Sequence, residues 1–122
     1  MISLLDCTLR DGGYINEWIF GRDTIRETIA SLTQAGLEYI EMGFMKTVPY
    51  NSDKTLFRAI ADFAPFIPGD RRQSKYYGMI ALGDYAIDDL PDFDGSSIDG
   101  IRVIFKKNKI TEGLAFAKQV KD

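Results

Sequence analysis

The sequence contains no histidine. It therefore offers no imidazole as a base or as a metal ligand, and catalytic triads that depend on histidine are excluded. A metal site made by these residues would have to use carboxylates, carbonyl groups and water. Such oxygen ligands suit magnesium or manganese better than zinc.

Other features are scarce as well. One cysteine excludes an internal disulfide and fits a reducing compartment. No apolar run is long enough to cross a bilayer, and the N-terminus lacks the basic start and apolar stretch of a secretory signal. The net charge of −3 gives no general attraction to nucleic acid. We therefore expect a cytoplasmic protein with neither a membrane nor a nucleic-acid partner.

What is present is an ordinary globular composition. Hydrophobic residues make up 45% and charged residues 27% of the 122 residues. A chain of this length can bury a core of its own. We therefore treat residues 1–122 as a single domain.

Short apolar runs alternate with helical spacing along the chain. A first helix is expected from Thr24, because Thr24 and Glu27 have capping-box spacing, and Gly36 is its expected stop. A second helix is expected after Ser52, which could cap it. Residues 84–95 allow at most a short helix. Strands are expected at Ile2–Asp6, Tyr39–Phe44, Tyr76–Leu82 and Ile101–Phe105. The helices are expected to bury apolar residues at helical spacing: Ile25, Ile29 and Leu32 in the first, Leu56, Ile60 and Phe63 in the second, and Ile110, Leu114 and Ala117 in a last helix at the end of the chain.

This alternation predicts βα units and a parallel sheet, so the fold class is α/β. Four such units amount to half of a (β/α)8 TIM barrel, and a complete barrel needs about 250 residues. The pattern alone fits either a small open α/β domain or a half barrel.

Charged residues gather where the first strand is expected to end. Asp6, Arg10 and Asp11 stand at the carboxyl end of a strand, where ligands bind in barrels and open α/β sheets. Glu41 lies inside the second apolar run and would be costly to bury alone. Arg10 is the expected partner, because guanidinium and carboxylate groups pair in a bidentate way. A purely structural ion pair explains the same spacing equally well.

The string LLDCTLRDGGY, followed by AGLEYIEMGF, resembles the HMG-CoA lyase-like, or DRE-TIM metallolyase, family. That family includes isopropylmalate synthase, HMG-CoA lyase and 4-hydroxy-2-oxovalerate aldolase. The string also resembles a group of aldolases that open with DCTLRDGGY and carry a nearby tryptophan, here Trp18. The resemblance covers the first two βα units and implies the N-terminal portion of an aldolase or pyruvate carboxyltransferase type of TIM barrel.

The resemblance implies specific roles. Asp11 corresponds to the metal-binding aspartate, Arg10 to the catalytic arginine, and Glu41 to the second-strand glutamate that orients it. The implied activity is cleavage or formation of a carbon–carbon bond beside the carbonyl of a 2-oxo acid. Mn²⁺ or Mg²⁺ would polarise that carbonyl, and Arg10 would stabilise the enolate oxygen.

The sequence departs from the family in two ways. Tyr14 occupies the position at which 4-hydroxy-2-oxovalerate aldolases carry a histidine base, so it is the candidate for that role. The His-x-His pair that completes the family's metal site is absent. We therefore expect no metal-dependent turnover by these residues alone, and either self-association or a missing C-terminal half-barrel.

Two alternatives stay open. A Schiff-base aldolase would use a lysine at a strand end, such as Lys106, as the nucleophile. A non-catalytic or partner-dependent remnant would keep the fold without the chemistry, and the absence of histidine favours that reading for the chain taken alone.

Overall fold

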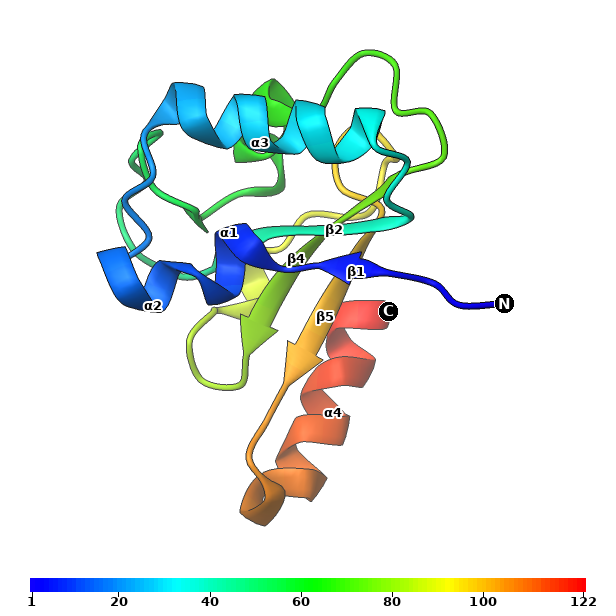
Figure 1. Ribbon diagram of the computed structural model, residues 1–122. Coiled ribbons are helices and arrows are strands. Elements are labelled where there is room, and N and C mark those ends of the chain that lie inside the picture. The colour runs from blue at the N-terminus through cyan, green and yellow to red at the C-terminus, as the bar shows by residue number, and fades with distance from the viewer.

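The structure is a computed structural model that describes residues 1–122 (Figure 1). One parallel sheet runs in the order β1-β2-β4-β5, and β3 pairs with the end of β2. The predicted α/β class with a parallel sheet is confirmed. The strands are β1 (Leu5–Asp6), β2 (Tyr39–Met45), β3 (Leu56–Phe57), β4 (Lys75–Ala81) and β5 (Gly100–Ile104), and the helices are α1 (Thr8–Asp11), α2 (Gly13–Asn16), α3 (Arg22–Gln34) and α4 (Ile110–Lys121).

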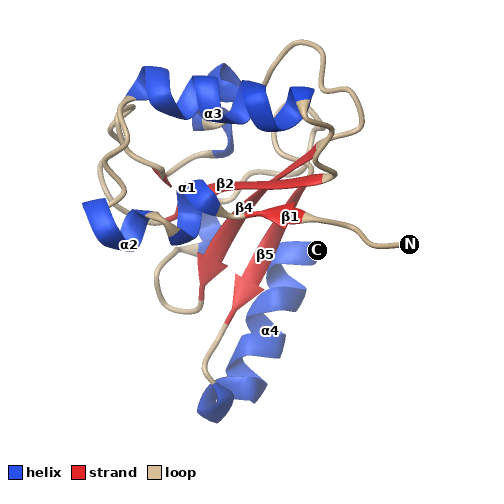
Figure 2. Cartoon of the chain, viewed as in Figure 1, coloured by secondary structure: helices blue, strands red, loops and turns tan.

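Helix α3 covers one face of the sheet (Figure 2). Its buried positions, Ile25, Ile29 and Thr33, recur at helical spacing and face the strands, and the Thr33 hydroxyl lies 2.8 Å from the Tyr76 hydroxyl of β4. The helix stops where predicted, because Gly36 adopts a left-handed φ of 81°.

The start of α3 differs from the prediction. The helix begins at Arg22, so the expected capping box at Thr24 is wrong. No side chain of the helix start caps it. Instead the Asp53 carboxylate accepts a hydrogen bond from the Arg22 backbone N–H at 3.0 Å, and this partner is too distant in sequence for a local motif to reveal.

The helix expected after Ser52 is also wrong. Its place is taken by β3 and two 3₁₀ turns, Ile60–Asp62 and Ala64–Phe66. Pro65 restricts helix propagation. The aromatic side chains are buried nonetheless, and the rings of Phe57 and Phe63 stack with centroids 4.0 Å apart. The apolar spacing after Ser52 thus predicted correctly that the aromatic side chains are buried, but it predicted a helix that does not form.

The first strand is shorter than predicted, since residues 1–4 are exposed and only Leu5–Asp6 pairs with β2. Between β4 and β5 there is only a 3₁₀ turn at Ile87–Asp89, as expected for this acidic segment. The prediction of four complete βα units is therefore wrong, because two of the four expected strands have no long helix after them. Long helices follow β1 and β5, but none follows β2 or β4.

Helix α4 forms where the sequence predicts it but buries a different face. Gly113 and Phe116 are buried, while Ile110 and Leu114 are 51% and 60% exposed. Gly113 is required because a Cβ there would lie 2.1 Å from the Phe105 ring. The predicted apolar stripe of α4 therefore points outward.

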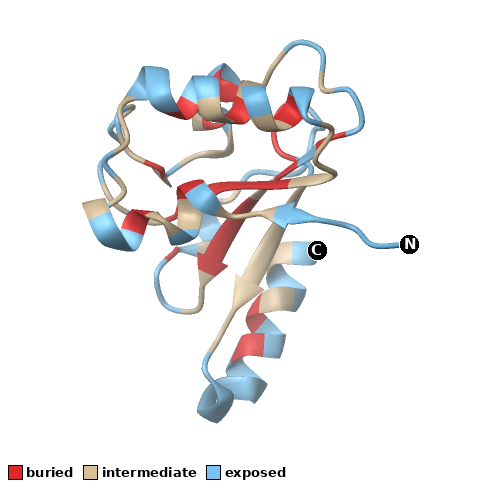
Figure 3. Cartoon of the chain, in the orientation of Figure 1, coloured by how far each residue is buried: buried red, intermediate tan, exposed pale blue.

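The core lies between the sheet and the helices (Figure 3). One cluster joins Ile29 of α3, Ile80 of β4 and Phe116 of α4. Tyr39 and Glu41 alternate along β2 with the core residue Ile40, so they belong to the opposite face of the sheet. None of the helices has the length and apolar content needed to cross a membrane.

Candidate active site at the end of the first strand

The segment after β1 is helical. Two single-turn helices, α1 and α2, bring the chain round the carboxyl end of the sheet. Two consecutive carbonyls of α1 accept side-chain hydrogen bonds. The Thr55 hydroxyl donates to the Leu9 carbonyl at 2.6 Å, and the Trp18 indole N–H donates to the Arg10 carbonyl at 2.7 Å. The backbone that carries Arg10 is therefore fixed from two sides.

The Trp18 contact requires an unusual backbone. Glu17 and Trp18 both adopt left-handed φ values, 56° and 61°, which are uncommon for residues with side chains. The indole then lies over Gly13, where a Cβ would come within 1.8 Å of it. Two strained residues and one obligatory glycine thus hold the tryptophan beneath Arg10, an arrangement often found at functional sites.

Glu41 is the centre of the site. Its side chain is fully buried in β2, and it accepts a hydrogen bond from Arg10 Nε at 2.5 Å on Oε1. Arg102 of β5 donates from Nε to Oε2 at 2.7 Å and from Nη2 to Oε1 at 3.0 Å. The pairing of Arg10 with Glu41 predicted from the sequence is present, and a second guanidinium shares the same carboxylate.

This arrangement sets the charge state of the centre. Burial by itself would raise the pKa of Glu41, but the hydrogen bonds and charges of Arg102 and Arg10 outweigh it and lower that pKa. The hydrogen bond to Glu41 in turn raises the pKa of Arg102. Both shifts favour the ionised forms, so Glu41 is a carboxylate shared between two guanidinium groups.

Asp11 lies at the solvent side of the same cluster. Its side chain is 64% exposed, and Oδ1 accepts a hydrogen bond from Arg10 Nη1 at 2.8 Å. The neighbouring Asp6 carboxylate is occupied locally by the backbone N–H and hydroxyl of Thr8. No three Cys, Asp or Glu side chains lie together in a way that could hold a metal ion. Asp11 alone does not fit a divalent metal.

Tyr14 contributes to an aromatic wall. Its side chain is exposed and meets the Trp18 ring edge-on at 4.9 Å and the Phe44 ring at 6.2 Å. The Lys46 ammonium lies 5.2 Å from the Phe44 ring centroid and 3.3 Å from an Asp84 carboxylate oxygen. Arg10 lies 6.0 Å from the same ring. The Phe44 ring thus joins the predicted residues Arg10 and Tyr14 to Lys46.

Sequence reasoning missed Arg102 and Lys46. The signal for Arg102 was available, since it interrupts the apolar run IRVIF as Glu41 interrupts YIEMGF, and a buried charge requires a partner. Lys46 directly follows β2, a position typical of ligand-binding side chains. Lys106, the alternative nucleophile, is exposed and precedes the 3₁₀ turn Lys107–Lys109.

A carboxylate held between two guanidinium groups, with an exposed carboxylate and an aromatic wall beside it, can bind and orient a small oxyanion or an enolate. No protein-family model, no curated protein and no solved structure matches this chain.

Proposed function

We propose that this chain carries the arginine-centred part of a carbon–carbon lyase or aldolase site that acts on a 2-oxo acid. The observation that carries the proposal is the buried contact between Arg10 and Glu41 at the carboxyl end of β1. The motif DCTLRDGGY, which resembles that of the HMG-CoA lyase-like metallolyases, supports the same proposal.

The geometry suits stabilisation of an enolate. Arg10 directs Nε to Glu41 and Nη1 to Asp11, while Nη2 has no hydrogen-bond partner within the protein. With the side chain only 14% exposed, a hydrogen bond from Nη2 to a developing oxyanion would be little weakened by solvent. Glu41 acts as a positioning residue, because it fixes the plane of the guanidinium.

The reaction would be aldol cleavage or its reverse. In cleavage, the 4-hydroxyl of a 4-hydroxy-2-oxo acid loses its proton, the C3–C4 bond breaks, and its electron pair forms the enolate of the smaller 2-oxo acid. Arg10 would donate a hydrogen bond to that enolate oxygen. Tyr14, exposed beside Trp18 and Phe44, is the proposed proton acceptor.

The resemblance also implies Mn²⁺ or Mg²⁺, for which this chain would contribute Asp11 alone. We therefore expect these residues to bind the 2-oxo acid without turning it over, and the test is a binding test. Oxalate is a stable planar mimic of the enolate of pyruvate. Calorimetry would compare pyruvate and oxalate on the wild-type chain and on Arg10→Gln.

The control is Arg26→Gln, since Arg26 is an exposed arginine on α3 whose closest carboxylate lies 3.8 Å away. We expect oxalate to bind more tightly than pyruvate, and the oxalate affinity to fall by about tenfold in Arg10→Gln, the loss typical of a charge-assisted hydrogen bond. Arg26→Gln should leave the affinity unchanged. Equal oxalate binding by all three proteins would refute the proposal.

A non-catalytic role for the same cluster is the competing interpretation. It is favoured by one observation, that both arginines are engaged by Glu41 as in a structural ion pair. Loss of the ion pair lowers the free energy of unfolding under either interpretation, so anion binding separates them: in a purely structural role neither anion would bind the wild-type chain.

A further inference from the structure

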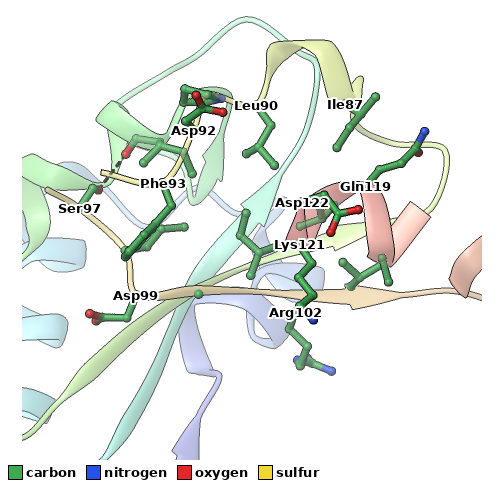
Figure 4. Close-up of a pocket in the computed structure, with 18 of the residues that line it drawn as sticks. Ile87, Leu90, Asp92, Phe93, Ser97, Asp99, Arg102, Gln119, Lys121 and Asp122 are labelled. Carbon is green, nitrogen blue, oxygen red and sulfur yellow. Dashed lines mark hydrogen bonds between the residues drawn. The ribbon is translucent and has the colours of Figure 1, made fainter. Parts of the chain in front are cut away.

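A groove of about 1080 Å³ lies between β5, the C-terminal half of α4 and the segment that joins β4 to β5 (Figure 4). It shares Arg102 with the Arg10–Glu41 cluster, but neither Arg10 nor Glu41 lines it. Its apolar lining includes Ile87 and Leu90 from the connecting segment, Ile101 and Val103 from β5, and Ala117 and Val120 from α4. The helix that would ordinarily follow β4 and cover such a surface is absent.

The charged lining of the groove is mainly acidic, with four aspartates against Arg102 and Lys121. Residues 83–99 contain six aspartates and neither lysine nor arginine. Asp92 and Asp94 line the groove beside Phe93, whose side chain is 77% exposed. An occupant that matches this surface must present apolar side chains flanked by positive charge.

The chain itself carries such a surface. On the N-terminal half of α4, the side chains of Ile110 and Leu114 lie one turn apart and are exposed. The three lysines Lys106, Lys107 and Lys109 precede this pair directly, and only Lys109 has a carboxylate partner, Glu112 at 3.5 Å.

We propose that the groove binds the N-terminal half of α4 from a second copy of this chain. The two α4 helices would run antiparallel about a two-fold axis. In that arrangement the N-terminal half of each helix faces the C-terminal half of the other, which bounds the groove. Both grooves are filled at once, and the contact closes as a dimer.

The lysines at the start of one α4 then face the aspartates on the rim of the other copy. This charge complementarity specifies the antiparallel direction, because a parallel pairing would bring the two lysine clusters together. The proposal does not depend on the proposed lyase activity. A chain that binds oxalate but stays monomeric up to about 1 mM would overturn the dimer and leave the lyase proposal standing.

Sedimentation equilibrium tests the dimer. We expect the wild-type chain to dimerise, with weaker dimerisation at high salt because the exposed charges are screened. Leu114→Asp should give a monomer without loss of fold, since its side chain is 60% exposed. The matched control is Ile15→Asp on α2, where the side chain is 93% exposed, and it should dimerise like the wild type.

A charge swap tests the direction of the pairing. Lys106→Glu/Lys107→Glu and Asp92→Lys/Asp94→Lys should each be monomeric alone, because like charges meet at both contacts. Mixed in equal amounts they should form a heterodimer, since one contact then has swapped charges and the other has the original ones. The lysine variant should fold well, because glutamates before a helix favour its N-terminal dipole.

Three results would overturn the proposal. One is a wild-type chain that stays monomeric up to about 1 mM, where even weak specific contacts form. The second is a dimer that persists in Leu114→Asp. The third is a mixture of the two folded charge variants that remains monomeric, with folding judged by near-ultraviolet circular dichroism.

Discussion

Glu41 binds Arg10 through one carboxylate oxygen and Arg102 through both, so two guanidinium groups from opposite ends of the chain meet on one buried side chain. Because either arginine can neutralise Glu41 in part, the two should compensate for each other. Arg10→Met and Arg102→Met are each expected to lower the free energy of unfolding by about 1–2 kcal/mol, the loss of charged hydrogen bonds. The double variant leaves a buried carboxylate without a partner.

The double variant should therefore cost more than the sum of the single variants. Urea denaturation of the four proteins measures this difference. Arg26→Met on α3 serves as the control, since its ion pair at 3.8 Å is exposed and should contribute little. Additive losses would mean that the arginines act independently of each other.

The stability of the chain should depend on pH through Glu41. Its folded-state pKa is lowered, so its ionised form stabilises the fold above its unfolded pKa of about 4.3. That contribution is lost as the pH falls below this value and through the folded pKa. Urea midpoints measured between neutral and acidic pH should fall most steeply below about pH 4.

Glu41→Gln supplies the comparison for the pH series. The variant should be less stable than the wild type at neutral pH, and its profile should be flatter in acid because the titrating group is gone. Other carboxylates still titrate, so some slope remains. Parallel profiles for the two proteins would contradict the assignment.

Gly43 on β2 should not tolerate a side chain. A Cβ at this position would lie 2.3 Å from the Thr55 carbonyl oxygen and 2.8 Å from the Phe57 ring. We expect Gly43→Ala to destabilise the protein by about 1–3 kcal/mol, as overpacking does in a filled core. Gly69→Ala is the matched control, because nothing lies within 4 Å of a Cβ there. Thermal unfolding compares the two variants, and Gly43→Ala should melt at the lower temperature. Equal melting temperatures would show that β3 can shift to make room for the added methyl group.

The isolated chain should bind Mn²⁺ only weakly. Asp11 is a single exposed carboxylate, and its closest partner is the positively charged Arg10 at 2.8 Å. A calorimetric titration, repeated on Asp11→Ala, is expected to give no saturable heat below about 1 mM in either protein. Saturable binding that disappears in Asp11→Ala would instead show that Asp11 belongs to a complete metal site.

Residues 1–122 contain some features that local patterns predict and others that they cannot. The strands Tyr39–Met45 and Lys75–Ala81 were predicted to within a residue or so, because buried parallel strands are continuous apolar runs. The pairing of Arg10 with Glu41 was predicted because a buried carboxylate requires a cation. Both inferences depend on which side chains can be buried at low free energy, and this can be judged from the residue types in the sequence alone.

The errors have a common origin in tertiary contacts. The prediction of a helix after Ser52 was wrong because Phe57 and Phe63 are buried by stacking on each other. This stacking does not require the residues to be helical. The Asp53 contact that caps Arg22 and the Arg102 contact with Glu41 span 31 and 61 residues. A pattern read within a window of ten residues contains no information about such partners.

Trp18 gives the protein a built-in optical probe. It is the only tryptophan, its indole N–H is bonded to the carbonyl of Arg10, and its ring meets Phe44 edge-on at 5.5 Å. Indole emission responds to hydrogen bonding and to nearby charge. A ligand that draws Arg10 toward itself should therefore change the fluorescence of the unmodified chain, and rapid mixing would follow that event in real time without any label.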